Sequence, residues 1–151
     1  MNIVTRLADM GIELPPAAAP VASYVPVVVQ GNLAFVSGQL PFIEGTLVTG
    51  KLGTDLGTER GIQAARACGL MILAQLEAAD LLDRVERVVK LGGFIACSPD
   101  FTDQPKVANG ASDLMVEVFG DAGRHARSAV GVPVLPLGAA VEVDAIFALK
   151  G

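Results

Sequence analysis

The order of its apolar periodicities constrains the fold of this 151-residue chain more than any other feature. Two stretches, 58–79 and 105–119, repeat apolar residues at the three- and four-residue spacings of an amphipathic helix. Stretches typical of β-strands lie before, between and after them, at 25–29, 33–36, 85–95, 128–134 and 139–149. This order predicts an α+β fold in which two helices cover one face of a mixed sheet.

Turn-forming residues mark the connections between these elements. The pair Gly31-Asn32 predicts a tight hairpin between the first two strands. Other expected features are a short ribbon at 42–48, a bulge at Gly92-Gly93, and a turn at 135–138 between the last two strands. Residues 1–12 favour a short amphipathic helix, and Pro15, Pro16 and Pro20 prevent it from continuing. We expect one domain over 1–151, with 1–20 as an N-terminal helix and proline-rich arm.

The chain has more apolar residues than this small fold needs. Hydrophobic residues make up 52% of it and the mean hydropathy is +0.53, yet no apolar run approaches the length of a membrane helix. Two helices can cover one face of the sheet, and no remaining segment is available for the other. A second copy of the chain is the natural cover, so we predict a homo-oligomer.

Charge and motifs exclude several classes of function. The net charge is −5 and the basic residues are scattered, so nucleic acid is not an expected partner. Neither a dinucleotide-binding motif nor a phosphate-binding loop occurs, and no ligand spacing predicts a metal, so the residues indicate neither a nucleotide nor a metal site. Cys68 and Cys97 form no disulfide framework, and charged residues interrupt the N-terminus where a secretory signal would lie. We therefore expect a cytoplasmic protein.

Three charged residues near the C-terminus are candidates for chemistry. Arg127 begins a strand of small and apolar residues, where a guanidinium could hold a carboxylate through two hydrogen bonds. Alternation in the final strand places Glu142 and Asp144 on one face, where desolvation could tune a carboxyl for proton transfer. The residues alone leave open two alternatives, an ordinary surface ion pair for Arg127 and a solvated sheet face for the carboxylates.

Several short segments occur in the order and nearly the spacing of a known family. They are Tyr24, the run Val36-Ser37-Gly38-Gln39-Leu40-Pro41, Asn109 opening the second helix, Ala126-Arg127-Ser128, Leu135-Pro136, and Val141 to Ile146. Over about residues 20 to 150 the chain resembles the RidA/YjgF family, formerly called L-PSP endoribonucleases. The resemblance implies a chorismate-mutase-like fold, assembled as a homotrimer with pockets between subunits.

The resemblance also implies an activity and the residues for it. Family members hydrolyse reactive enamines and imines such as 2-aminoacrylate to a 2-keto acid and ammonia, with no cofactor. Arg127 resembles the arginine that binds the substrate carboxylate, and Glu142 the glutamate that places or activates water. The other substrate-binding residues implied are Tyr24, Ser37, Gly38, Asn109 and Ala129. Such a protein would be a 2-iminobutanoate/2-iminopropanoate deaminase-like hydrolase.

Three departures from the family pattern bear on this expectation. Many members have a cysteine where this chain has Ala129, which excludes a covalent or redox role there. The N-terminal arm is longer than in compact members, and His125 could be structural or could tune a proton step.

A pocket that binds a keto acid without turnover is the alternative function. Ribonuclease activity is a weaker third, because the chain is acidic and has one histidine.

Overall fold

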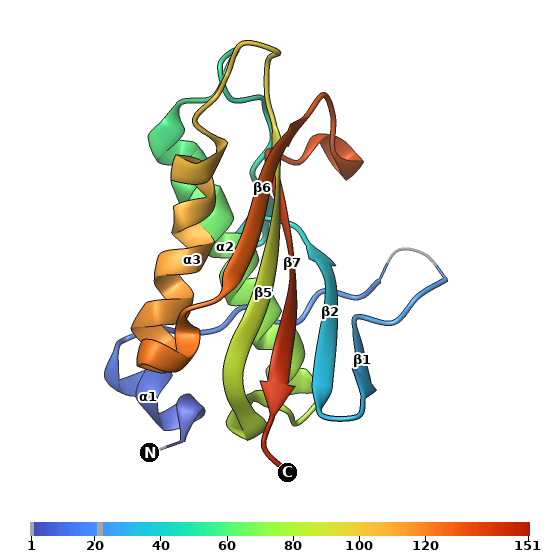
Figure 1. The fold of residues 1–151 in the computed structure, drawn as a ribbon. Helices are drawn as coiled ribbons and strands as arrows, with labels where there is room; N and C mark the ends of the chain where they lie inside the picture. Colours follow the sequence, from blue (N-terminus) through green and yellow to red (C-terminus); the bar gives the residue numbers. More distant parts are fainter. Residues whose placement is uncertain (1, 21–22) are drawn as a thin grey trace.

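A computed structural model describes residues 2–20 and 23–151 as one α+β unit (Figure 1). The helices are α1 (Ile3–Asp9), α2 (Thr58–Ala78) and α3 (Gln104–Phe119). The strands are β1 (Val27–Gln30), β2 (Leu33–Gln39), β3 (Phe42–Ile43), β4 (Thr46–Leu47), β5 (Val85–Ala96), β6 (Ala126–Val132) and β7 (Val141–Leu149). The two long helices, the first hairpin and the ribbon around Gly45 are confirmed.

The main sheet has five strands in the order β1-β2-β7-β5-β6. Strands β5 and β6 run parallel and the other neighbours run antiparallel, which confirms the mixed sheet. The turn at 135–138 is present, but it joins two strands that are not neighbours, because β5 lies between β6 and β7. Strand β6 is therefore an edge strand, and one side of it is unpaired.

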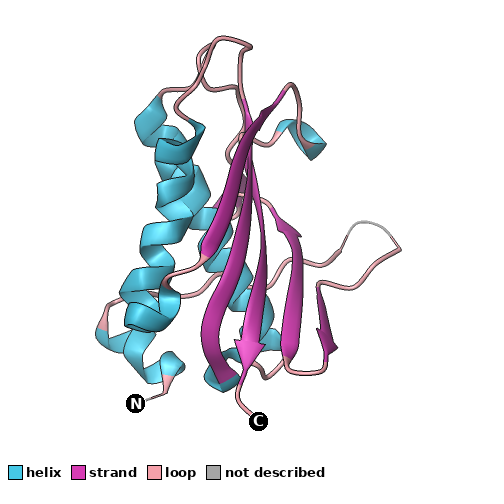
Figure 2. Ribbon diagram, in the orientation of Figure 1, coloured by secondary structure: helices cyan, strands magenta, loops and turns pink. Residues whose placement is uncertain are grey.

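Helices α2 and α3 lie together on one face of this sheet, as Figure 2 shows. Small residues allow the two helices to approach closely: a side chain at Gly110 of α3 would collide with the backbone of Ile62 in α2. The core beneath them includes the fully buried Leu73, Leu114 and Phe147. Helix α2 is the longest, and neither it nor any other described helix is both long and apolar enough to cross a bilayer.

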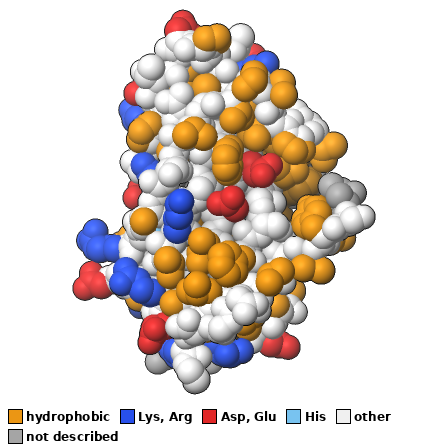
Figure 3. Space-filling model, turned by 45° about the vertical axis from the view of Figure 1, so that its right-hand side comes forward, with side chains coloured by type: hydrophobic (Ala, Val, Ile, Leu, Met, Phe, Trp, Pro, Cys, Tyr) orange, Lys and Arg blue, Asp and Glu red, His pale blue; other side chains and the backbone are white. Residues whose placement is uncertain are grey.

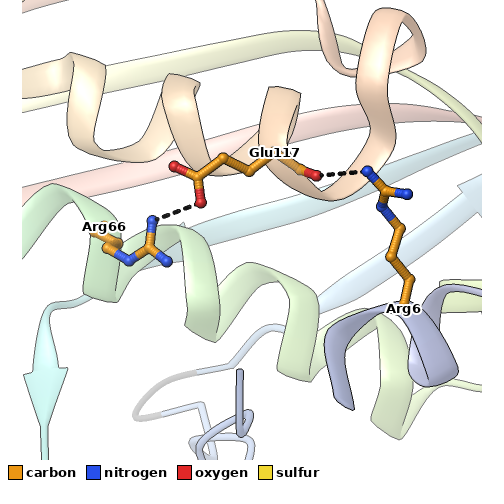
Figure 4. A network of polar contacts seen from close by, with 3 residues as sticks. All are labelled: Arg6, Arg66 and Glu117. Atoms are coloured by element: carbon orange, nitrogen blue, oxygen red, sulfur yellow. Dashed lines mark hydrogen bonds and ion pairs between the residues drawn. The ribbon is translucent and has the colours of Figure 1, made fainter. Parts of the chain in front are cut away.

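The N-terminal arm is ordered along the helix layer. Helix α1 ends before Gly11, whose positive φ of 71° suits glycine. Figure 4 shows how α1 is tied to the long helices: Arg6 donates to the Glu117 carbonyl at 3.0 Å, and Arg66 pairs with the Glu117 carboxylate at 3.4 Å. Further along, the buried side chain of Gln75 donates to the Ala18 carbonyl at 2.7 Å. These contacts hold the arm against the helix layer.

The bulge predicted at Gly92-Gly93 is wrong, because pairing with β7 continues through both residues. The irregularities of β5 lie nearer its start, between Val85 and Lys90. Both glycines make room instead: a side chain at Gly92 would strike the Asp144 carboxylate, and one at Gly93 would lie 3.4 Å from the Ala108 methyl. A close approach explains these glycines better than a backbone kink does.

The second face of the sheet has no cover from any segment that the structure describes. Large apolar side chains lie exposed on or beside it, with exposed fractions of 49% for Val28, 40% for Phe35 and 46% for Val130. Figure 3 shows hydrophobic side chains spread across one side of the molecule with acidic side chains among them. We call this surface the open face of the sheet.

Candidate functional site

Arg127 lies near the start of β6 and reaches across to α3. Its Nη1 donates to Asn109 Oδ1 at 2.8 Å and to Ser112 Oγ at 3.1 Å, and its Nη2 donates to the Pro105 carbonyl at 3.3 Å. A guanidinium has five N–H donors, so these three bonds leave two donors available. The arrangement fixes the plane of the group and leaves enough donors for one carboxylate.

No carboxylate within the described ranges lies at ion-pair distance from Arg127; the ion pairs found there involve Arg66 and Arg124. The alternative of an ordinary surface ion pair for Arg127 is therefore wrong. Its partners are neutral oxygens, which orient the guanidinium and leave its charge uncompensated. Such a group is suited to bind an anion from solution.

His125 contacts the same serine as Arg127. Its Nε2 lies 2.8 Å from Ser112 Oγ, and its Nδ1 lies 2.6 Å from the Gly123 carbonyl. The histidine is thus linked to Arg127 through Ser112, on the same side of the sheet. No pattern in the sequence indicates Ser112, because helix α3 brings it to Arg127 of β6 from 15 residues away.

The final strand carries the two candidate carboxylates on the open face. Along β7, Val143 is buried against the helices while Glu142 and Asp144 are half-buried on the opposite side, which confirms the predicted alternation. Each carboxylate lies over a glycine of a neighbouring strand, Glu142 over Gly38 and Asp144 over Gly92. A methyl group at either glycine would displace the carboxylate above it.

Burial changes the acidity of both groups. Desolvation raises the pKa of Glu142 above its ordinary value, and the nearby charge of Asp144 raises it further. Desolvation also raises the pKa of Asp144, against the opposing effects of the Gly92 backbone N–H and the Lys90 charge. Both carboxylates are half-buried, so the alternative of a fully solvated sheet face is wrong for this part of β7.

A bulge in β2 shapes the backbone beside Glu142. The pairing of β2 with β7 shifts by one residue between Val36 and Gln39. The segment Ser37-Gly38 therefore has one residue more than the segment of β7 that faces it. The Ser37 hydroxyl donates to the Pro26 carbonyl at 3.2 Å. Beyond the bulge, the buried Gln39 turns toward the helices and accepts a hydrogen bond from Gln75 at 3.1 Å. No local signal in the sequence indicated this pair of buried amides.

The remaining predicted site residues lie in different surroundings. Tyr24 is 45% exposed on the segment before β1. Asn109 does not open α3 as expected, because the helix begins at Gln104 and Asn109 lies in its second turn, where it meets Arg127. Ala129 follows Arg127 on β6 and packs against the core.

Arg127 and Glu142 lie on opposite faces of the sheet in a single chain. Arg127 pairs with Leu91, which is buried under the helices, and its side chain bonds to α3. Glu142 pairs with Phe94 and points away from the helices, over Gly38. One chain therefore presents an anion-binding group on one side of the sheet and a candidate base on the other.

Two hollows accompany these features. One of about 340 Å³ lies on the open face and is lined in part by Ser37, Phe94, Ser128 and Asp144. A larger one of about 810 Å³ lies between the N-terminal arm, the β3–β4 ribbon and α2, and contains none of the predicted site residues. The arm thus borders a cavity in the helix layer and does not lie over Arg127.

Comparisons with known proteins agree with this architecture. The model of the YjgF/chorismate mutase-like endoribonuclease family matches residues 4–149. Protein TCP17 of Trypanosoma cruzi is 54% identical over 152 residues, covering 99% of this chain and 95% of that protein. A 2-iminobutanoate/2-iminopropanoate deaminase of Dermatophagoides farinae is 30% identical over 141 residues, covering 92% of this chain and 95% of that protein. The crystal structure of Atu1372 from Agrobacterium tumefaciens, whose function is unknown, matches with a TM-score of 0.89 at 46% identity, covering 98% and 92% of the two chains.

Proposed function

Because this chain belongs to the YjgF/chorismate mutase-like family, as its resemblance to RidA/YjgF proteins indicated, we propose that it is a hydrolytic deaminase of reactive enamines and imines. The products are a 2-keto acid and ammonia, and no cofactor is needed. The observation that carries this proposal is the guanidinium of Arg127, oriented by neutral oxygens with two donors left for a carboxylate. The deaminase of Dermatophagoides farinae among the relatives supports the reaction class.

Arg127 selects and orients the substrate. A 2-aminoacrylate-like molecule carries a carboxylate next to its enamine or imine carbon, so holding the carboxylate fixes the position of the reacting carbon. The imine tautomer is already electrophilic, and the protein needs to supply only water and proton transfer. Asn109 orients Arg127 from α3, while Tyr24, Ser37 and the backbone at Gly38 and Ala129 complete the proposed pocket.

Glu142 handles the protons of hydrolysis. It accepts a proton from water as the water oxygen adds to the carbon of the protonated imine, which gives a neutral tetrahedral carbinolamine. It then returns that proton to the nitrogen and takes the proton of the carbinolamine hydroxyl as the C–N bond breaks, so that ammonia leaves and a carbonyl remains. A carboxyl whose pKa is raised by desolvation suits both directions of this transfer better than a solvated one.

The complete site requires a second copy of the chain. Arg127 and Glu142 lie on opposite faces of the sheet, so we place the pocket between the Arg127 side of one subunit and the Glu142 side of the next. The open face supplies an apolar surface for this contact, since Val28, Phe35 and Val130 are exposed. A homotrimer closes such a head-to-tail arrangement with three equal pockets.

A trapping assay tests the activity. 2-Aminoacrylate and bulkier imino acids are generated in the presence of semicarbazide, and the enzyme competes with trapping by converting the imine to keto acid. We expect Arg127→Ala to lower kcat/KM by about 10²-fold or more, because it removes the charged partner of the carboxylate. Arg124→Ala is the matched control, since Arg124 is exposed and pairs only with Asp121 at 3.6 Å. Equal rates for the two variants would refute the role of Arg127.

A mixing experiment tests the shared pocket. Arg127→Ala and Glu142→Gln subunits, each inactive alone, are combined into mixed oligomers. A pocket between subunits recovers roughly a quarter of the wild-type activity, because random mixing pairs an intact Arg127 with an intact Glu142 at that frequency. A pocket within one chain recovers none.

Carboxylate binding without turnover is the second candidate function. It is favoured by one observation, that a single chain holds the oriented Arg127 with Glu142 on the far side of the sheet. Calorimetry with pyruvate separates the two candidates. Binding that requires Arg127, together with no conversion of any imine by the assembled protein, would favour the binding module.

A further inference from the structure

We infer that Ser112 and His125 are positioning residues that orient Arg127 for the substrate carboxylate. This inference rests on the proposed function, adds Ser112 to the site and gives His125 a positioning role in place of the proton step considered from the sequence. It follows from a chain of hydrogen bonds that runs from Gly123 through His125 and Ser112 to Arg127.

The Gly123 carbonyl and the Arg127 guanidinium fix the directions of the two outer hydrogen bonds, and the Nδ1–H tautomer of His125 fixes that of the middle one. The Gly123 carbonyl can only accept, so His125 Nδ1, 2.6 Å away, carries the proton. In the neutral ring Nε2 is then an acceptor, and the hydroxyl of Ser112 donates to it at 2.8 Å. The lone pairs of Ser112 Oγ remain to accept from Arg127 Nη1 at 3.1 Å. With the Nδ1–H tautomer of the ring, all three contacts are satisfied.

This arrangement determines where the free donors of Arg127 point. Both hydrogens of Nη1 are directed, one to Ser112 and the other to Asn109. Two fixed hydrogens on one nitrogen set the plane of the guanidinium, so the two unused donors keep one orientation at the edge of the sheet. An arginine side chain loses considerable rotamer entropy when it is fixed, and the chain of hydrogen bonds meets this cost before the substrate arrives.

His125 therefore acts through Ser112 and does not itself contact the carboxylate. Without the ring nitrogen, the Ser112 hydroxyl is free to rotate and its lone pairs no longer face Arg127 reliably. Without the hydroxyl, Nη1 loses one of its two acceptors. Both changes weaken the binding of the carboxylate, and neither touches the proton transfer assigned to Glu142.

Steady-state kinetics with four variants test the inference. We expect Ser112→Ala and His125→Ala each to raise KM for the imine about tenfold with kcat within about twofold, the effect of losing one hydrogen bond to a charged group. His125→Gln retains an acceptor near the position of Nε2 and is expected to restore KM to near the wild-type value. Asp113→Asn is the control, because Asp113 is exposed on α3 next to Ser112. An unchanged KM in Ser112→Ala and His125→Ala would overturn the inference, whatever their thermal stability.

A second measurement does not depend on turnover. Nitrogen-15 NMR of the His125 ring in the free protein is expected to show the Nδ1–H tautomer, and Ser112→Ala is expected to shift the Nε2 resonance; an Nε2–H tautomer would overturn the inference. Calorimetry with pyruvate separates this failure from failure of the proposed function. If the wild type converts no imine but binds pyruvate, and Ser112→Ala weakens that binding about tenfold, the positioning role holds and the deaminase proposal fails.

Discussion

The two faces of the sheet differ in burial, and strand β7 contributes residues to both. On the helix side, Val141, Val143 and Phe147 are fully buried or nearly so. On the open side, Glu142 and Asp144 are half-buried, although they alternate with those residues in the same strand. Adjacent residues of one strand thus belong alternately to the buried core and to the uncovered surface of the sheet.

The difference shows how the chain separates folding from function. The helix face buries its apolar area within one chain and can stabilise the domain alone. The open face combines exposed apolar side chains with two carboxylates that resist ionisation, a combination that costs stability in a lone subunit. In the proposed assembly a second copy of the chain covers this surface, and its carboxylates belong to the proposed pocket.

Removing a phenylalanine from each face gives the largest expected contrast. Phe147→Ala should lower the free energy of unfolding by about 3–5 kcal/mol, because Phe147 is fully buried and packs against Phe119 with ring centroids 6.2 Å apart. Phe35→Ala removes the same side chain from the open face, where it is 40% exposed, and should cost a lone subunit about 1 kcal/mol or less.

Denaturant unfolding at low protein concentration measures both costs, and sedimentation measures the assembly of the same variants. We expect Phe35→Ala to weaken self-association more than it weakens the fold. Equal destabilisation by the two substitutions would show that the open face belongs to the core of one chain.

Two glycine substitutions distinguish the roles of the two carboxylates. Gly38→Ala pushes aside the carboxylate of Glu142, and Gly92→Ala pushes aside that of Asp144. If Glu142 manages the protons, Gly38→Ala should lower kcat by about 10²-fold, the usual contribution of a positioned general base. Gly92→Ala should change kcat by much less.

Both displaced groups are the flexible ends of side chains, so each variant should fold. Circular dichroism and sedimentation check this before the kinetics are compared. A larger loss of kcat in Gly92→Ala than in Gly38→Ala would transfer the proton-handling role to Asp144.

Removing a buried amide from the helix face should cause the next largest loss of stability. Gln75 is 3% exposed and joins the Ala18 carbonyl of the arm to the side chain of Gln39. Gln75→Ala should destabilise the domain by about 1–3 kcal/mol, because it leaves the buried Gln39 amide and the half-buried Ala18 carbonyl without their partner. Gln63→Ala, on an exposed position of the same helix, should stay within about 0.5 kcal/mol. Equal effects in urea unfolding would mean that the arm is not held through Gln75.

The sequence predicts features that depend on residues close together in the chain. The spacing over 58–79 matches α2, and the alternation around Glu142 matches the two faces of β7. The sequence does not predict contacts between residues that lie far apart in the chain. Ser112 meets Arg127 because α3 lies beside β6, and Gly92 is explained by the Asp144 carboxylate of another strand. The bulge at Ser37 and Gly38 depends likewise on how β2 pairs with β7.

The smallest expected effect concerns the pH dependence of stability, and its sign follows from the open face. The pKa of Glu142 is raised in the folded chain above its ordinary value of 4.5, so the folded state binds this proton more tightly than the unfolded state does. Unfolding therefore releases a proton between 4.5 and the raised pKa, and the contribution of Glu142 to stability falls as pH rises through that window. At neutral pH the ionised carboxylate is a net cost.

Glu142→Gln removes that cost, so we expect its Tm to exceed that of the wild type at pH 7 and the difference to narrow as the pH approaches the ordinary value of 4.5. Calorimetric scans at several pH values measure the difference, and Glu86→Gln, at an exposed position of β5, controls for the loss of one negative charge. A difference that stays constant with pH would mean that Glu142 is as well solvated as an ordinary surface carboxylate. In that case Glu142 would impose no electrostatic cost on the fold, although it lies on the open face.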